Sequence, residues 1–539
     1  MLTINKKNLR ERRADFEKAG IRVGDIDIDA LAVRTAANPR WVHFGAGNLF
    51  KAYHAALAQE LVERGLLDTG IIALVPNDFS NIETLYTQND NLFLKVVMKA
   101  DGGLDKRLIS AVTDFIAAGP EQSADWERVK AIFAAPSLQM VTVTITEKGY
   151  ALKTPDGAFV PQAETDFAAG PVSPTHAMSK IAAQLYERYR QGAHPIALVS
   201  TDNFSHNGDK LKAAVETVAK EWARRGLVDG GFLDYLADPN KAAFPLTMID
   251  KITPYASAAV QKQLAADGIG GMEIVTSARG SVTAPFVNTE EAEYLVIEDC
   301  FPNSRPPLEA AGVYFTSREK VDMVERMKVC TCLNPLHTAL AIFGCLLGYT
   351  SIWEEMQDAA LAALVRRIAY DEGMPVVTDP GIIKPEAFVR EVLEVRFPNP
   401  NIPDTPQRIA TDTSQKMGIR FGETIKAYIA SPSLDAAALK FIPLVIAAWC
   451  RYLVCIDDTG TPFTPSPDPL LPALQKELAG VSLGSSPSAG RLKPILSNEK
   501  IFGVNLYEAG LGAAIERSFE KMLAAPGAVR TTLVESLAK

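Results

Sequence analysis

The sequence predicts an α/β domain in the amino-terminal part of the chain and a mainly α-helical domain after it. Three observations carry this prediction. A short apolar strand, a glycine-containing turn and a helical stretch follow one another between residues 40 and 65. Further short strands end in polar residues, whereas helical periodicity dominates after residue 350. The length of 539 residues also exceeds what one compact core accommodates.

We expect three parts along the chain. Residues 1–39 form a polar extension that packs on the first domain, residues 40–300 form the α/β domain, and residues 301–539 form the helical domain. The helical pattern of the last part is clearest over Ser351–Asp371 and Lys384–Arg396. Each of the two domains should therefore build its own hydrophobic core.

The composition describes an ordinary globular protein. Hydrophobic residues make up 47% and charged residues 22% of the chain. The formal net charge of −9 and the isoelectric point near 5.4 argue against nucleic acid as a partner. An anionic substrate therefore requires a local cluster of Lys and Arg within an otherwise acidic molecule.

Cysteine usage and apolar runs predict a cytoplasmic protein. The six cysteines lack a framework spacing, so they are expected to be reduced and mostly buried. Cys330 and Cys332 form a C-x-C pair without other nearby ligands, which favours a protein without a bound metal. The basic amino terminus lacks the apolar core of a secretory signal, and no uninterrupted apolar run reaches bilayer-spanning length. We expect no membrane partner.

The first strand and the turn after it are typical of a Rossmann-type dinucleotide-binding domain. Arg40–Phe44 reads as a buried strand, and the following turn leads into a helix over Leu49–Gly65. Glycines let the backbone approach a pyrophosphate, and the helix start offers N–H groups to it. Phe50 stands where the usual fingerprint has a third glycine. The residues expected at the cofactor are Gly45, Gly47, Asn48, Leu49 and Phe50.

A carboxylate follows the second strand and bears on the choice of cofactor. The strand Gly70–Val75 leads into Pro76, Asn77 and Asp78. A carboxylate at this place accepts hydrogen bonds from the adenosine ribose and repels a 2′-phosphate, so Asp78 favours NAD over NADP. Alternatively, Asp78 caps the next turn, and Asn77 leaves NADP open.

Two later strands also end in polar residues. Leu138–Ile145 runs into a loop with Glu147, which is either a residue of the site or the ion-pair partner of Lys148. Ile196–Ser200 is followed by Asp202 and Asn203, which can close a turn after the strand. Both loops would lie at the carboxyl ends of their strands.

The stretch Met327–Tyr349 combines polar groups with a strongly apolar run. Lys328 can exchange a proton, Asn334 can stabilise an oxyanion, and His337 can hydrogen-bond a hydroxyl group. The alternative is structural: Asn334 as N-cap and Pro335 at the first helical position would begin a buried helix. The stretch alone does not decide between catalysis and capping.

These motifs resemble the long-chain polyol dehydrogenases, the mannitol dehydrogenase family. That family carries a Lys…Asn-x-x-His element before an apolar helix that ends in Gly-Tyr, and a T-E-x-G-Y loop near the nicotinamide. The resemblance implies an NAD-binding Rossmann domain and a helical substrate domain. It also implies roles for six residues: Lys328 as general base, Asn334 and Asn203 as the oxyanion-hole amides, His337 as a substrate ligand, Glu325 as a proton relay and Glu147 on the cofactor side.

One departure from the family pattern concerns the geometry of the lysine. Five residues separate Lys328 from Asn334, where the family usually has four. One extra residue rotates a helix by about 100°. Lys328 can therefore face Asn334 only if a π-bulge or a break before Pro335 absorbs the extra residue.

Two further segments resemble parts of the family that contact substrate. Met248–Pro254 resembles a V-D-R-I-x-P element, in which Asp250 positions the substrate or anchors this segment. Arg408 and Lys416 lie in a segment that closes over substrate, and in a sugar-acid enzyme they would bind the carboxylate. Alternatively, Arg408 forms a salt bridge between the domains.

The resemblance implies a metal-independent, NAD-dependent oxidoreductase that interconverts a secondary alcohol of a linear sugar derivative and its ketone. The run C-L-N-P-L-H-T-A-L is most similar to the fructuronate reductase branch, which interconverts D-mannonate and D-fructuronate. The alternatives are mannitol or arabinitol 2-dehydrogenase, tagaturonate reductase, a redox-neutral epimerase with bound NAD, and a non-catalytic NAD-binding sensor. The expected partner is a small sugar acid or polyol, and the expected state is a monomer or small homo-oligomer.

Overall fold

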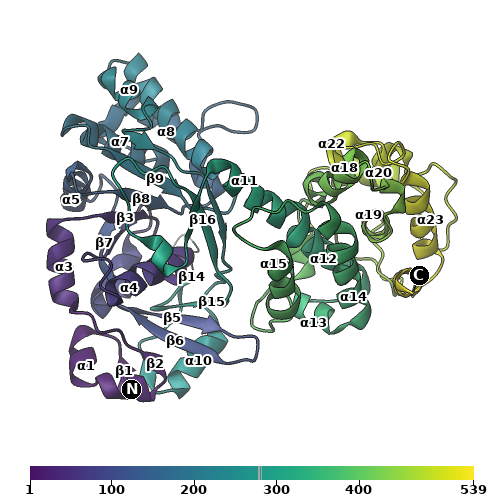
Figure 1. The fold of residues 1–539 in the computed structure, drawn as a ribbon, viewed down its shortest axis with the longest axis horizontal. Helices are drawn as coiled ribbons and strands as arrows, with labels where there is room; N and C mark the ends of the chain where they lie inside the picture. The colour runs from purple at the N-terminus through teal and green to yellow at the C-terminus, as the bar shows by residue number, and fades with distance from the viewer. Residues whose placement is uncertain (277–279, 281, 539) are drawn as a thin grey trace. The chain divides into compact units, whose positions relative to one another are not determined.

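The computed structural model describes residues 1–276, 280 and 282–538. The chain divides into two compact units (Figure 1). Unit 1 comprises Met1–Lys99 and Gly103–Val321, and unit 2 comprises Ala100–Gly102 and Asp322–Lys539. The division after Val321 falls within helix α11 (Arg318–Arg326).

Unit 1 is built on a six-stranded parallel sheet with the order β10-β9-β8-β3-β4-β7. Its strands are almost wholly buried, as expected of a parallel sheet covered on both faces. The strand order reverses between β3 and β8, which is where α/β sheets bind ligands at the strands' carboxyl ends. The predicted Rossmann-type domain is confirmed. The strands are β3 (Trp41–Phe44), β4 (Ile71–Val75), β7 (Val112–Ala117), β8 (Met140–Val143), β9 (Ile196–Ser200) and β10 (Ala242–Ala243).

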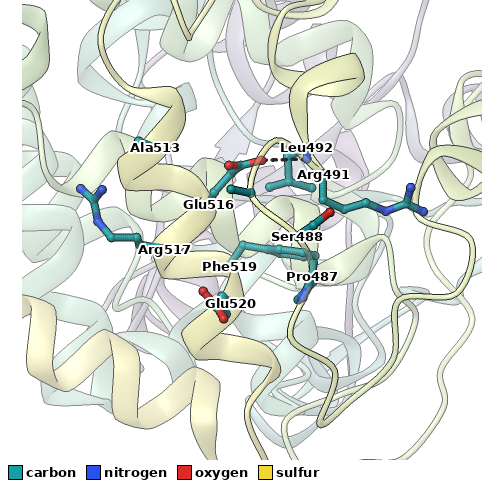
Figure 2. A pocket seen from close by; sticks show the side chains of 10 residues that line it. Pro487, Ser488, Arg491, Leu492, Ala513, Glu516, Arg517, Phe519 and Glu520 are labelled. Atoms are coloured by element: carbon teal, nitrogen blue, oxygen red, sulfur yellow. Dashed lines mark hydrogen bonds between the residues drawn. The ribbon is translucent and has the colours of Figure 1, made fainter.

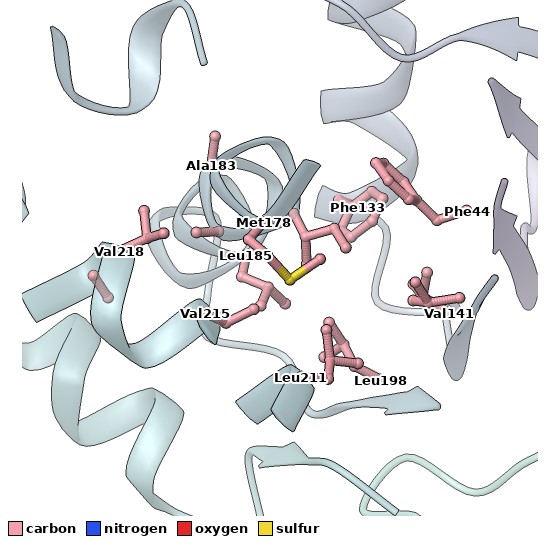
Figure 3. Close-up of a cluster of buried hydrophobic side chains, with 14 of the residues drawn as sticks. Phe44, Phe133, Val141, Met178, Ala183, Leu185, Leu198, Leu211, Val215 and Val218 are labelled. Carbon is pink, nitrogen blue, oxygen red and sulfur yellow. The ribbon is translucent and has the colours of Figure 1, made fainter. Parts of the chain in front are cut away.

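Alternate residues of β3 supply two hydrophobic cores, one on each face of the sheet. Val42 and Phe44 join the core under α5, α7 and α8, which Figure 3 shows around Met178 and Phe133. Trp41 joins the other core, with η1 and α4. These helices are η1 (Phe50–His54), α4 (Ala55–Glu63), α5 (Ser123–Ala134), α7 (Ala177–Arg190) and α8 (Asn207–Arg224).

Smaller sheets and helices complete unit 1. The amino-terminal extension contributes β1 (Leu2–Thr3), which pairs with β12 (Ile269–Gly270), and β2 (Ile21–Arg22), which pairs with β6 (Leu104–Ile109). The other elements include α1 (Lys6–Glu11), α2 (Arg13–Lys18), α3 (Ile28–Ala37), β5 (Phe93–Met98), η4 (Glu147–Tyr150), α6 (Pro161–Ala169), α9 (Gly231–Ala237), β11 (Thr247–Asp250), α10 (Ala258–Ala266), β15 (Phe286–Thr289), β16 (Tyr294–Glu298) and β17 (Tyr314–Thr316).

Unit 2 is mainly helical, as predicted, and its core surrounds α12 (Asn334–Leu347) and α19 (Phe441–Tyr452). The helices around them include η7 (Met327–Cys332), α13 (Ile352–Gln357), α14 (Ala359–Arg367), η8 (Ile368–Gly373), α15 (Pro385–Glu391), η10 (Val392–Arg396), α16 (Pro406–Ile409), α17 (Thr413–Met417), η11 (Gly418–Gly422), α18 (Glu423–Ala430), α20 (Leu471–Glu477), α21 (Lys493–Leu496), α22 (Glu499–Phe502), α23 (Gly512–Leu523) and α24 (Ala528–Leu537). Among these surrounding helices, α14 and α23 are amphipathic, and their buried residues are mostly apolar.

One helical run, Arg318–Leu347, is long and apolar enough to cross a membrane by length and composition alone. Within its most apolar window 83% of the residues are buried inside the protein. A core helix of a globular protein has the same character, so this run is weak evidence for a membrane span.

Candidate functional site

The turn after β3 fits a dinucleotide for two different reasons. Gly45 has φ of 115°, and a Cβ there would lie 2.1 Å from the carbonyl oxygen of Thr144. Only glycine therefore permits this approach of two strand ends. A Cβ at Gly47 would meet nothing within 4 Å, so this side of the turn is open to an approaching phosphate. Asn48, at the start of the helix, donates a hydrogen bond to the carbonyl oxygen of Pro254 at 3.1 Å.

The side chain of Phe50 belongs to the core rather than to the open face of the turn. Its ring is fully buried, stacks on His43 with 4.5 Å between the ring centroids, and meets Phe115 edge-on. Leu49 before it is half-buried. Lys51 is also buried and donates to the carbonyl oxygen of Ala284 at 3.1 Å. A contact of Phe50 with the cofactor would therefore involve its backbone.

Asp78 lies two residues after the proline that follows β4, in a left-handed conformation with φ of 58°. It is half-buried, and the Ser80 hydroxyl donates to its carboxylate at 2.8 Å. Sequence reasoning missed Lys180 of α7, which is buried and donates to the carbonyl oxygen of Pro76 at 2.7 Å. The turn that follows β4 thus contains a carboxylate and is held by a lysine from a different helix.

Asp202 joins the loops that follow β8 and β9. Its carboxylate accepts hydrogen bonds from the main-chain N–H groups of Ile145 and Thr146, both at 2.9 Å, and from the Tyr150 hydroxyl at 2.6 Å. Burial raises the pKa of Asp202, although these hydrogen bonds oppose the shift. Asp202 is therefore the anchor of this part of unit 1.

The three other residues of unit 1 that were predicted to belong to the site differ in their exposure to solvent. Glu147 is exposed and pairs with Lys210 of α8 at 2.9 Å, rather than with the neighbouring Lys148. Asn203 is exposed on the loop after β9. Asp250 is buried at the end of β11. The structure thus leaves Glu147 and Asn203 accessible to a ligand and encloses Asp250.

The backbone between Lys328 and Asn334 is π-helical and then breaks, the two features that could absorb the extra residue. Lys328 lies in the π-helix η7, and the N–H of Leu333 donates to the carbonyl oxygen of Lys328 at 3.1 Å, a five-residue step. Leu333 then breaks the helix with φ of −131° and ψ of −63°. The side chain of Lys328 is buried, and Glu325, one turn earlier, is half-buried.

The capping alternative for Asn334 is wrong. The N-cap position of α12 is occupied by Leu333, and no side chain caps the helix there. Asn334 is the first helical residue and is half-buried. Within the described ranges no hydrogen bond of its side-chain amide is recorded. The amide group of Asn334 is thus available to a ligand, as an oxyanion donor must be.

A carboxylate that the sequence did not indicate lies next to His337. Its Nε2 lies 3.1 Å from a carboxylate oxygen of Asp404, and its ring packs on Phe397 with 5.0 Å between the centroids. Arg408 forms a short ion pair with the same carboxylate. The partner of Arg408 therefore lies four residues away in its own unit, contrary to the alternative of a salt bridge between domains.

Two cations lie on the short helices after Arg408. Lys416 donates to the carbonyl oxygen of Thr411, and burial together with the nearby Arg420 lowers the pKa of Lys416. Arg420, which the sequence analysis did not single out, donates to the Thr338 hydroxyl. Burial lowers the pKa of Arg420 to about 10. The only signal in the sequence was its position four residues after Lys416.

A pocket of about 210 Å³ lies elsewhere in unit 2, between the loop before α21 and helix α23 (Figure 2). Glu516 accepts hydrogen bonds there from the N–H groups of Gly490 and Leu492, at 2.8 and 3.0 Å. None of the predicted site residues lines it. In the part of the chain that the structure describes, no three His, Cys, Asp or Glu side chains are grouped as metal ligands.

Two family domains match the chain in order. Residues 39–310 match the mannitol dehydrogenase Rossmann domain, and residues 320–523 match the mannitol dehydrogenase C-terminal domain. The chain belongs to the mannitol dehydrogenase family. The resemblance identified from the sequence motifs is confirmed, and the two matches agree with the α/β and helical units.

Several known dehydrogenases match most or all of the chain. D-mannonate oxidoreductase of Thermotoga maritima is 51% identical over 99% of each chain. Mannitol 2-dehydrogenase of Pyricularia oryzae is 28% identical over 93% of each chain. The solved ternary complex of Pseudomonas fluorescens mannitol 2-dehydrogenase with NAD and D-mannitol is 27% identical, has a TM-score of 0.70 and covers 100% of both chains. A substrate-free D-sorbitol dehydrogenase has a TM-score of 0.75 at 25% identity and covers 95% of this chain and 100% of its own.

Proposed function

We propose that the chain is an NAD-dependent oxidoreductase that interconverts D-mannonate and D-fructuronate. The observation that carries this proposal is the 51% identity with a D-mannonate oxidoreductase over 99% of both chains. The matches to mannitol 2-dehydrogenases are at 28% identity or close to it, which makes oxidation of a neutral polyol the second candidate. We also propose a cytoplasmic protein that acts on small molecules as a monomer or small homo-oligomer.

The residues of unit 1 fit a bound NAD. The open side of Gly47 gives the pyrophosphate room beside the start of the helix, and the carboxylate of Asp78 suits the ribose hydroxyls of NAD better than a 2′-phosphate. When bound, the nicotinamide supplies hydride chemistry. NADP is the less favoured cofactor, and the proposed chemistry needs no metal ion because amide groups stabilise the developing charge.

The side chains of the chain itself would handle the proton and the oxygen charge. Lys328 accepts the hydroxyl proton of mannonate during oxidation, and its ammonium form returns a proton during ketone reduction. Asn334 and Asn203 are the proposed amide donors to the oxygen. Glu325 passes the proton between Lys328 and solvent.

Three more residues are proposed to contact the substrate. His337 would hydrogen-bond a hydroxyl group, and its ring is oriented for that task by Asp404 and Phe397. Asp250 is proposed to position the substrate, and Lys416 to bind its carboxylate. Together these groups match a polyhydroxylated chain with one charged end.

The test is turnover of matched ketones by the purified protein. With NADH, fructuronate should be reduced much faster than fructose, which carries a hydroxymethyl group in place of the carboxylate. Faster reduction of fructose would favour mannitol 2-dehydrogenase activity. Tight NADH binding without turnover of fructuronate, tagaturonate or fructose would favour the sensor.

A further inference from the structure

Arg420 is partly exposed, and it has fewer hydrogen-bond partners in the protein than two arginines that are fully buried. Arg188 is fully buried and donates five hydrogen bonds to main-chain carbonyl oxygens. Arg451 is fully buried and donates three. For Arg420 one hydrogen bond is recorded among the described residues, to Thr338, and no carboxylate pairs with it there.

The single protein partner leaves other donors of Arg420 open to water or to a ligand. A guanidinium carries five N–H donors and always keeps its charge, so an anion that displaces this water gains charge-assisted hydrogen bonds. Lys416, one turn earlier, adds a second positive charge that favours an anion at this place. A protein with a net charge of −9 has many carboxylates, yet the described residues provide none to Arg420.

Arg408, by contrast, already has its anion. It forms a short ion pair with Asp404, which also lies 3.1 Å from His337. Its role is therefore explained by the orientation of His337. Of the three cations in this segment, Arg420 and Lys416 remain for an anionic ligand.

The position of Arg420 relative to Asn334 suits a sugar acid. Arg420 donates to the Thr338 hydroxyl, and that hydroxyl donates to the carbonyl oxygen of Asn334 at 2.9 Å. Asn334 and Thr338 are four residues apart on α12, a rise of about 6 Å. In fructuronate four carbon–carbon bonds separate the carboxylate carbon from the ketone carbon, an extended span of about 5 Å. A substrate held at Asn334 by its ketone oxygen can therefore reach Arg420 with its carboxylate.

We propose that Arg420, assisted by Lys416, binds the substrate carboxylate and selects sugar acids over polyols. This inference rests on the proposed function and names the side chains that decide its substrate class. It also revises the expectation for Arg408, which becomes the residue that holds Asp404 against His337.

The experiment compares Arg420→Gln with the unaltered protein on two ketones that differ at one end, fructuronate and fructose. Loss of a charged hydrogen-bonding pair should lower kcat/KM for fructuronate about 10- to 100-fold, mainly through KM. The value for fructose should stay within about twofold, so the preference between the ketones collapses. Arg420→Lys should retain part of the preference because it keeps the charge but loses the bidentate geometry.

Arg517→Gln is the matched control, since Arg517 is exposed on α23 of the same unit. This variant should leave kcat/KM unchanged for both fructuronate and fructose. An equal loss on both ketones in Arg420→Gln would overturn the proposal and assign Arg420 to structure or to catalysis. An unchanged preference would overturn it as well.

A binding measurement keeps this inference separate from the proposed reaction. Calorimetry on the NAD-loaded protein should detect tighter binding of mannonate than of mannitol, and Arg420→Lys should weaken only mannonate binding. This outcome supports the anion site even if fructuronate is not turned over. Equal binding of mannonate and mannitol by the unaltered protein, or no binding of mannonate, would overturn it. The folded state of each variant is checked by its thermal unfolding, and Arg420→Lys replaces Arg420→Gln where the latter does not fold.

Discussion

Asp202 in unit 1 is a buried charge and Arg420 in unit 2 is a partly exposed one, and the protein provides them with very different numbers of hydrogen-bond partners. Asp202 accepts hydrogen bonds from two main-chain N–H groups and a tyrosine hydroxyl. Arg420 has a single recorded partner among the described residues, the hydroxyl of Thr338. A buried polar group needs partners in the protein, as Asp202 has, whereas a partly exposed one such as Arg420 can keep donors for a ligand. Asn334 belongs with Arg420 in this respect.

The largest effect is expected from Lys328→Ala, which tests whether unit 2 supplies the group that exchanges the proton. Loss of the general base should lower kcat about 10²- to 10⁴-fold. The affinity for NADH should remain within about twofold, because the proposed cofactor contacts lie in unit 1. Stopped-flow turnover and NADH fluorescence titration measure the two quantities. Unchanged turnover would remove Lys328 from the mechanism.

Asp202→Ala tests how much the hydrogen bonds of the buried Asp202 carboxylate stabilise unit 1. The substitution leaves two N–H groups and the Tyr150 hydroxyl without their acceptor, so the free energy of unfolding should fall by about 3 kcal/mol. Urea denaturation measures the loss. Asp209→Ala, at an exposed carboxylate on α8, is the control and should cost less than about 1 kcal/mol. A similar loss of unfolding free energy in both variants would show that Asp202 is not the anchor of these loops.

Acid pH should destabilise unit 1 through two buried histidines, which unlike Asp202 are buried in their uncharged form. Burial lowers the pKa of His43 well below its ordinary value and that of His54 to about 3. Below a pH of about 6.5 these histidines bind protons in the unfolded chain but not in the folded one. Their contribution to the free energy of unfolding is therefore fully present above that pH and decreases as the pH falls. The loss should approach about 1.4 kcal/mol per pH unit for each histidine.

Denaturation by urea at pH 7, 6 and 5 measures this dependence. His54→Leu should reduce the slope of stability against pH. His206→Gln should leave it unchanged, since His206 is exposed. A slope that His54→Leu does not alter would assign the acid sensitivity to other groups.

The smallest effect is expected from Asp404→Asn, which weakens the orientation of His337 without removing it. The loss in kcat/KM should be about tenfold, in the range found for residues that orient a functional histidine. The pH dependence of kcat/KM should also shift, because the charge next to the imidazole is lost. Phe397→Leu is a useful comparison, as it removes ring packing but keeps the charge. An unchanged pH profile in Asp404→Asn would argue against this coupling.

Local patterns in the sequence predicted the parts of the fold that local physics decides. The strand before Gly45, the helix after it and the helical character of unit 2 follow from apolar spacing and glycine placement. The spacing of Lys328 and Asn334 made a π-bulge or a break a condition for the two side chains to meet, and the structure has a π-helix at Lys328. The alternative that made Asn334 the N-cap of α12 was wrong because the break after the π-helix falls at Leu333, so that Asn334 is already helical.

The pairing of charges was not predictable, since it depends on contacts between segments distant in the sequence. The pair of Arg408 with Asp404 is the exception, because it spans only four residues and helical spacing could have indicated it. Asp404 beside His337 and Lys180 beside the turn after β4 are contacts between distant segments. A resemblance supplies roles for residues, whereas the structure is needed to find which of them the protein has already neutralised.

Three of the segments discussed share an unusual backbone: η1 after the glycine turn, η7 with Lys328 and η11 with Arg420 are all π-helical. A π turn is wider and weaker than an α turn, so its amide hydrogens exchange with solvent more readily than those of the flanking helices. Cofactor and substrate should slow deuterium uptake in η1 and in η7 with η11, respectively. Mass spectrometry of the exchanged peptides can then read the occupancy of each half of the enzyme without any turnover.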